Sequence, residues 1–225
     1  MKRLIVAIDG PSGAGKGTIS RTLAQTLGYR HVDTGAMYRA VGWKAQHDGL
    51  AVEDEAAVAA LAQRSAIVVE GGVVSIDGHD VTRAIRTPEM DKAAAAVARL
   101  PKVREVLVAR QRDIGAGGGV VMEGRDIGTV VFPHADVKIY LDASEEERAR
   151  RRATDPAHTG SMVGQAAVAE AIKARDKSDT TRAASPLTLA PDAVHIDTTD
   201  MPIHEVVARV MAIVAQKKRR PVKGP

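Results

Sequence analysis

The sequence has no cysteine and few aromatic residues. None of its 225 residues is cysteine, which excludes disulfide bonds and thiolate metal sites. The seven histidines show no close ligand spacing, so we expect no histidine-rich metal centre. Aromatic residues make up 2% of the chain, so the hydrophobic core must be built from aliphatic side chains. The aromatic residues are Tyr29, Tyr38, Trp43, Phe132 and Tyr140.

Long apolar runs are missing as well. No run approaches the roughly 20 apolar residues that a membrane-spanning helix needs. The run LIVAI at 4–8 is too short for the apolar part of an export signal, and glycines follow it in place of a cleavage site. We therefore expect a cytoplasmic protein without a membrane partner.

The charge of the chain leans positive. Its formal net charge of +4 is compatible with an anionic partner. Part of this charge lies in KKRRPVKGP at 217–225, which is either a solvated chain end or a patch that binds nucleic acid. The tail has no aromatic residues on which bases could stack, which favours the solvated end. We expect a monomer without a nucleic-acid partner.

Strand patterns alternate with helical patterns along most of the chain. Continuous aliphatic runs such as RLIVAI are typical of strands covered on both faces, as in a parallel sheet. The alternation predicts an α/β fold with a parallel central sheet of about five strands flanked by helices. We expect strands at 3–8, 30–33, 120–123, 137–142 and 193–197, and helices at 16–27, 35–47, 89–113, 144–152, 165–178 and 202–218.

The segment AIVVEGGVVSIDGHDVT at 66–82 breaks this alternation. EGG and DGH separate short β runs, which indicates hairpin turns in a small antiparallel sheet. We interpret 62–96 as an insertion in a core domain formed by 1–61 and 97–225. A polar, helix-breaking segment between two basic helices is a candidate for a short lid at about 153–163.

The run DGPSGAGKGT lies between the first strand and the first helix. Gly10, Gly15 and Lys16 match G-x-x-x-x-G-K in the strand–loop–helix context that a phosphate-binding P-loop requires. Backbone N–H groups, the helix N-terminus and the lysine would together hold the phosphates of ATP. A plain strand–turn–helix connection is the alternative. The predicted ATP-binding residues here are Gly10, Pro11, Ser12, Gly13, Ala14, Gly15, Lys16, Gly17 and Thr18.

The run departs from the common P-loop at one position. The usual motif places Ser or Thr, whose hydroxyl helps to hold Mg²⁺, directly after the lysine. Here Gly17 follows Lys16 and the hydroxyl comes one residue later, at Thr18. The form GKGT is found in small nucleoside-monophosphate kinases. We expect Mg²⁺ to be held through water and the nucleotides, with no dedicated metal site on the protein.

Arginines are frequent where strands are expected to end. Transfer to a phosphate acceptor needs many cations and no general base, whereas a hydroxyl acceptor would benefit from a carboxylate. Ligands of open α/β sheets bind at the carboxyl edge, where these arginines should lie. They are Arg39, Arg104, Arg125, Arg148, Arg151, Arg152, Arg175 and Arg182.

The sequence closely resembles the bacterial cytidylate kinases, which phosphorylate CMP and dCMP with ATP. The resemblance runs from Leu4 to about Lys217, and GRDIGTVVFP and RDKSDTTRA are its most specific blocks. It implies a P-loop kinase fold, use of Mg²⁺ with ATP, and an antiparallel insertion at the nucleoside-monophosphate site. It is carried by IDGPSGAGKGT, VDTGAMYRA, IRTPEM, PKVREVL, EGRDIGTVVFPHADVKIYLDAS, RARRRA and IKARDKSDTTRAASPL.

The resemblance also implies residue roles. Lys16, Arg125 and Arg175 match catalytic positions, and Arg151 and Arg152 match charge clamps on ATP. The implied CMP-binding residues are Thr34, Arg39, Arg104, Arg125, Asp126, Arg175, Asp179 and Arg182.

The role implied for Asp126 has a chemical rationale, and the roles implied for Arg175, Asp179 and Arg182 have an alternative explanation. Asp126 is a natural acceptor for the N4 amino group of cytosine, whereas it would repel the uracil carbonyl at that place. Arg175, Asp179 and Arg182 lie at i, i+4 and i+7 and share a helix face if the helix extends that far. Spacing alone would also fit an exposed ion pair on a solvated face.

A second departure concerns specificity. The family commonly has a serine that touches the base where our alignment places Ala95. Its loss would weaken discrimination between cytosine and uracil, unless the alignment slips or another group substitutes. Two alternative functions remain: a kinase of the same fold with another acceptor, such as UMP or shikimate, and a non-catalytic protein that binds nucleotides or nucleic acid.

Overall fold

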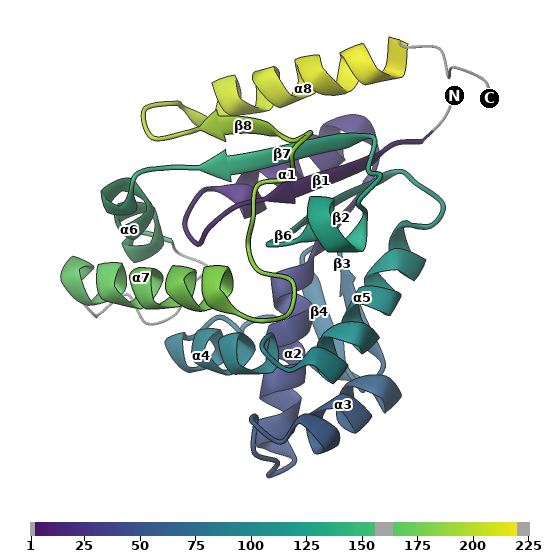
Figure 1. The fold of residues 1–225 in the computed structure, drawn as a ribbon, viewed down its shortest axis with the longest axis vertical. Coiled ribbons are helices and arrows are strands. Elements are labelled where there is room, and N and C mark those ends of the chain that lie inside the picture. The colour runs from purple at the N-terminus through teal and green to yellow at the C-terminus, as the bar shows by residue number, and fades with distance from the viewer. Residues whose placement is uncertain (1–2, 156–163, 220–225) are drawn as a thin grey trace.

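A five-stranded parallel sheet forms the centre of the fold (Figure 1). The structure, a computed structural model, describes residues 3–155 and 164–219. The strand order is β2-β6-β1-β7-β8, so the first strand lies in the middle. The strands are β1 (Ile5–Asp9), β2 (Arg30–Asp33), β6 (Val120–Gly124), β7 (Val137–Asp142) and β8 (Val194–Asp197).

Helices cover both faces of this sheet. On one face Val6 and Ile8 of β1 pack with Leu23 of α1 and Val210 of α8, whereas Ala7 packs into a second core on the other face. Figure 1 shows α8 along one side of the sheet and α2, α3, α4 and α5 on the opposite side. The helices are α1 (Lys16–Leu27), α2 (Thr34–His47), α3 (Glu55–Arg64), α4 (Pro88–Val97), α5 (Pro101–Gly115), α6 (Glu145–Ala153), α7 (Gln165–Thr181) and α8 (Ile203–Arg219).

The chain segment between α3 and α4 forms a second, antiparallel sheet. It consists of β3 (Ile67–Glu70), β4 (Val73–Ile76) and β5 (His79–Asp80). Ala36 and Ala40 of α2 share a core with Val74 and Ile76 of β4. The expected fold class is therefore confirmed: a parallel sheet of five strands carries a small antiparallel sheet.

The predicted element bounds were wrong at several places. The single helix expected at 89–113 is two helices, because Pro101 restricts the preceding Leu100 to an extended conformation and starts α5 at its first position. The helix α3 was missed, although the Asp54 side chain caps it by accepting from the N–H of Ala57. A short π-helical turn, η1 (Ile127–Val131), follows β6 and was not expected either.

Most of the candidate lid lies outside the residues that the structure describes. Of the segment 153–163, residues 156–163 lie outside the described residues. Ala153 is the last residue of α6, which Ser144 caps by accepting from the N–H of Glu147. Glutamates in its first turn and arginines in its last match the helix dipole, and Arg151 and Arg152 line the cavity described below. None of the described helices is long and apolar enough to cross a membrane.

Candidate active site

A cavity of about 1090 Å³ opens at the carboxyl ends of the parallel strands. The loop after β1 and helices α2, α4, α6 and α7 all contribute to its wall. This is the edge at which open α/β sheets bind their ligands, because loops from neighbouring strands diverge there. Predicted site residues that line it are Ser12, Gly13, Ala14, Gly15, Lys16, Gly17, Thr18, Thr34, Arg39, Arg104, Arg125, Asp126, Arg151, Arg152, Arg175 and Arg182.

The loop after β1 has the backbone of a phosphate cradle. Gly15 has φ 87° and caps α1 in the left-handed region, where a side chain would be strained. A Cβ on Gly13 would lie 2.7 Å from the carbonyl oxygen of Arg148, so the loop requires glycine there. Lys16 curls back over the loop, and its Nζ donates to the carbonyl of Pro11 at 2.6 Å. Gly10 and Pro11 do not line the cavity, and a Cβ on Gly10 would lie 2.0 Å from the carbonyl oxygen of Leu141.

Lys16 and Asp9 are buried together beneath this loop. Burial, followed by repulsion from Arg125, lowers the pKa of Lys16 to about 7, although Glu123 and two aspartates act in the opposite direction. Burial raises the pKa of Asp9 to about 6, even though its carboxylate accepts from the N–H groups of Ile127 and Gly128. The site therefore holds a lysine that readily loses its proton while no anion is bound.

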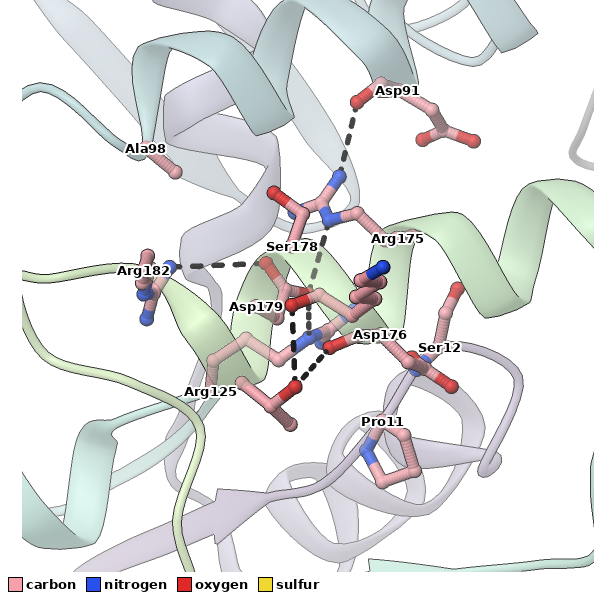
Figure 2. Close-up of polar contacts among 12 residues, drawn as sticks. Pro11, Ser12, Asp91, Ala98, Arg125, Arg175, Asp176, Ser178, Asp179 and Arg182 are labelled. Carbon is pink, nitrogen blue, oxygen red and sulfur yellow. Dashed lines mark hydrogen bonds and ion pairs between the residues drawn. The ribbon is translucent and has the colours of Figure 1, made fainter.

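Asp179 gathers three arginines from two segments, as Figure 2 shows. Its Oδ2 accepts from Nε of Arg125 at 2.8 Å and from Nε of Arg175 at 3.0 Å. Its Oδ1 lies 3.9 Å from Nη1 of Arg182. Because Asp179 is only 1% exposed, it lies behind the cavity wall and holds the guanidinium groups that form it. Its implied role as a CMP-binding residue stays a prediction.

A second buried acid orients two arginines on the α5 side of the cavity. Nη2 of Arg104 donates to Oδ2 of Asp126, and Nη2 of Arg182 lies 3.6 Å from Oδ1. Burial raises the pKa of Asp126 despite the opposing charges of Arg104 and Arg182. Arg104 also lies over the ring of Tyr38 at 5.5 Å. Nε of Arg104 and Nη2 of Arg182 are buried without a hydrogen-bond partner among the described residues, and both arginines line the cavity.

A third group of charges lies around the end of β2, α2 and the start of α4. Nη2 of Arg86 and Nη1 of Arg39 lie 3.4 Å and 3.7 Å from Oδ2 of Asp33, which ends β2. Burial alone would raise the pKa of Asp33, but these arginines and the N–H of Ala36 lower it to about 2. Arg39 also lies 3.3 Å from Asp91 of α4.

The loop after β1 is connected to α6 and α7 through an ion pair between the buried Arg148 and the partly buried Asp176. Nη1 of Arg148 donates both to the carbonyl of Ser12, at 3.0 Å, and to Oδ2 of Asp176. Oδ1 of Asp176 in turn accepts from the N–H of Ser12 at 3.2 Å. In Figure 2, α7 carries Asp176 next to Pro11 and Ser12, and Arg175 next to Asp91. Helix α7 therefore contacts both the phosphate cradle and α4.

The two arginines expected to clamp ATP differ in their partners. Arg151 donates from Nη1 to the hydroxyl of Thr198 at 2.9 Å and from Nη2 to its carbonyl at 2.7 Å. Arg152 instead donates to the Asp91 carboxylate across the cavity. Near Thr198 the wall becomes apolar, with Met201, Pro202 and a 56% exposed Ile203. This end can accommodate a flat, apolar group such as a base.

Several acidic residues of the site were missed by the sequence reasoning. Asp9, Asp33 and Glu123 lie at or near the ends of β1, β2 and β6. An acidic residue at the end of an aliphatic strand pattern could have identified them as candidate site residues. Glu123 lines the cavity, and its Oε1 lies 2.7 Å from Nε2 of His31. Asp91 carried no such signal. Ala95 lines the cavity, and its alignment with a base-contacting position stays a prediction.

The comparisons with known proteins agree on one family. The sequence model of the cytidylate kinase family matches residues 6–216. A cytidylate kinase of Pelotomaculum thermopropionicum is 50% identical over 219 residues, covering 95% of this chain and 97% of that protein. A cytidylate kinase of Solibacter usitatus is 48% identical and covers 96% of this chain and 94% of that protein.

Solved structures of low sequence identity share the fold. A gluconokinase from Sinorhizobium meliloti, 13% identical, superposes with a TM-score of 0.51 over 95% of this chain and 93% of that chain. A shikimate kinase from Bacteroides thetaiotaomicron, 11% identical, has a TM-score of 0.50 over 94% and 98%. At such identities the likeness concerns the fold alone. The family match and the close relatives together show that this chain belongs to the cytidylate kinase family.

Proposed function

We propose that this protein transfers the γ-phosphoryl group of ATP to CMP or dCMP and forms ADP with CDP or dCDP. The observation that carries this proposal is a single cavity in which a P-loop lysine faces arginines from four helices, in a chain of the cytidylate kinase family. The arginines outnumber what one triphosphate needs, which supports a second phosphate ligand as the acceptor.

The loop at 10–18 would hold the triphosphate of ATP. Its N–H groups and the N-terminus of α1 offer donors to phosphate oxygens, and Lys16 supplies a charge at the β- and γ-phosphates. Lys16 already has its Nζ in the loop, on the carbonyl of Pro11. The apolar end near Ile203 suits the adenine, with Arg151 fixed beside it by Thr198.

Arg125 and Arg175 would grip the transferred group and the acceptor phosphate. Asp179 accepts from Nε of both guanidinium groups and so fixes them in the cavity wall. Fixed cations need no reorganisation when negative charge spreads over the transferred oxygens. No general base is required, because the attacking oxygen of CMP already belongs to a phosphate.

The wall around Asp126 would hold the cytosine. Its neighbours Arg104 and Arg182 leave buried N–H donors without partners, and the small Ala95 and Ala98 line the same cavity. A cytosine brings a carbonyl, a ring nitrogen and an amino group, which match these donors and the Asp126 carboxylate. Thr34 lines the cavity too, although its hydroxyl donates to the carbonyl of Glu123 at 2.7 Å.

The site fits Mg²⁺ that arrives with the nucleotide. Mg²⁺ bound between phosphates keeps several waters and takes one or two protein oxygens. A Cβ on Gly17 would lie 3.7 Å from Oε1 of Glu123, so this carboxylate faces the position where other P-loops carry a hydroxyl. Glu123 and Thr18 are the residues that would hold the ion or its waters. The ion would neutralise phosphate charge during transfer.

The remaining sequence expectations are part of this proposal. We propose that the insertion at 62–96 serves the acceptor, that the segment 153–163 serves as a lid, and that the protein is a cytoplasmic monomer. Its ligands would be ATP, CMP and dCMP, without nucleic acid or membrane.

The products of the reaction test this function. Purified protein with ATP, Mg²⁺ and CMP should give equal amounts of ADP and CDP by anion-exchange chromatography with ultraviolet detection, and no ADP without CMP. Lys16→Ala should remove nearly all turnover while its far-UV circular dichroism stays that of the native fold. If ADP forms at the same rate with and without CMP, the protein is no CMP kinase.

A further inference from the structure

Asp91 of α4 lies where three cavity arginines meet. Nε of Arg39 from α2 is 3.3 Å from its Oδ1, and Arg152 from α6 donates to its Oδ2. Arg175 from α7 donates to its main-chain carbonyl at 3.0 Å, a contact drawn in Figure 2. All four residues line the cavity. One carboxylate thus brings together cations from elements that are far apart in the sequence.

The hold of Asp91 on Arg39 is loose. The ion pair at 3.3 Å does not have hydrogen-bond geometry, and the other carboxylate near Arg39, Asp33, lies 3.7 Å from Nη1. Nη1 of Arg39 is buried and has no hydrogen-bond partner among the described residues. An anion with more oxygens than a carboxylate would satisfy this guanidinium better, because phosphate accepts bonds from both edges of the fork.

We propose that the Asp91 carboxylate occupies a phosphate subsite of the ligand-free protein and that the monophosphate of the acceptor displaces it. Arginines brought this close repel one another, and Asp91 offsets that repulsion while no nucleotide is bound. A monophosphate dianion cannot share these cations with a carboxylate without like-charge repulsion. Acceptor binding therefore includes the release of Asp91 from Arg39 and Arg152.

This inference rests on the proposed function. It can be separated from a purely structural role of Asp91, because the two predict opposite changes in the affinity for CMP when the Asp91 carboxylate is removed. If Asp91 only holds the arginines in place, its removal weakens CMP binding. If Asp91 competes with phosphate, its removal tightens CMP binding, because the cost of displacing it disappears. Competition acts only on ligands that carry the phosphate, so the affinity for cytidine should not change.

The experiment compares Asp91→Asn with Glu89→Gln and the native protein. Both substitutions remove one negative charge from the first turn of α4, but Glu89 is exposed and lies outside the cavity wall. We expect the Kd of CMP, measured by calorimetry, to fall about fivefold or more in Asp91→Asn. In Glu89→Gln it should stay within about twofold of the native value. Inhibition by cytidine should be equal in all three proteins.

Each outcome is decisive. If the native protein does not bind CMP, the proposed function fails and the inference with it. If the native protein binds CMP but Asp91→Asn binds it equally or more weakly, the inference alone fails. Equal tightening in both variants would show a general charge effect and would also overturn the inference, as would tighter binding of cytidine. Asp91→Glu keeps the charge and should not tighten CMP binding.

Discussion

At the scale of single residues, the buried lysine of the phosphate cradle has two consequences. Lys16 is 7% exposed, and its neighbour Arg125 carries the same sign of charge. Its pKa is about 7 in the fold, against an ordinary value of 10.5. Between these two pH values the unfolded chain binds more protons than the folded one, so this residue makes stability rise with pH there. At and below pH 7 its buried charge costs stability.

Replacing Lys16 should therefore stabilise the protein while removing its activity. We expect Lys16→Met to raise the melting temperature at pH 6 by about 3–6 °C, because no charge is buried. Differential scanning calorimetry at pH 6 measures this. The matched control is Lys138→Met: Lys138 is also buried and, like Lys16, donates to a backbone carbonyl, but its Nζ also forms an ion pair with Asp192, so its loss should lower the melting temperature. A lower melting temperature for Lys16→Met would contradict this account.

Binding of ATP should take up a proton above neutral pH. Triphosphate next to Lys16 restores the charged form, which the free protein loses as the pH rises through about 7. We expect up to about one proton bound per ATP at pH 8 and little at pH 6. Calorimetry in buffers of different ionisation enthalpy measures the number of protons. An uptake at pH 8 that persists in Lys16→Met would assign it to another group.

We expect Ala95, which lines the cavity, to influence the selectivity between acceptor nucleotides. Ala95 offers no hydroxyl to a cytosine, whereas the family commonly has a serine at this position of our alignment. We expect Ala95→Ser to raise the ratio of kcat/KM for CMP over UMP about three- to tenfold, the value of one hydrogen bond. Ala98→Ser, at a neighbouring position of the same wall, is the control. An unchanged ratio would mean that another group reads the base.

At the scale of elements, α7 connects the two halves of the proposed site. Asp176 binds the cradle through Ser12 and Arg148, and Arg175 binds α4 through the carbonyl of Asp91. Because Arg148 is 5% exposed, removing its partner leaves a buried charge unpaired.

Weakening the contacts of Asp176 with Ser12 and Arg148 should raise the KM for ATP more than the KM for CMP. We expect Asp176→Asn to raise the KM for ATP about tenfold and to lower the free energy of unfolding by about 3 kcal/mol, with the KM for CMP little changed. Steady-state kinetics with each substrate varied in turn and urea denaturation measure the two effects. Glu170→Gln removes an exposed negative charge from the same helix and should change neither. Equal changes in both KM values would refute a specific tie to the cradle.

The elements themselves were predictable to different degrees. Buried strands such as β1 and β7 have continuous aliphatic runs, and α1 begins at the P-loop lysine, so these were found from local pattern. The break between α4 and α5 depends on Leu100 and Pro101, within an alanine-rich stretch that favours one helix. Helix α3 was missed because its alanine pattern gives a weak periodicity, and tertiary packing of Leu61 and Val58 stabilises it.

At the scale of the whole molecule, the site combines residues that no local pattern connects. The arginines were found because they stand in motifs shared with the cytidylate kinases. The acids that orient them were found only where they stood in the same motifs, as Asp126 and Asp179 do. Asp176 stands in the RDKSDTTRA block, but its contacts with Ser12 and Arg148, like the contacts of Asp91, depend on how α4, α6 and α7 pack, and this packing is not written in any short stretch.

The central claim is that the two ligands of this cavity are ATP and a cytidine monophosphate. The most direct measurement is kcat/KM for ADP formation with CMP, dCMP, UMP, AMP, GMP and shikimate under the same conditions. We predict that CMP or dCMP leads and exceeds AMP, GMP and shikimate by at least about 100-fold, with UMP nearer because of Ala95. A higher value for AMP, GMP or shikimate than for both cytidine nucleotides, or no acceptor-dependent ADP at all, would contradict the account.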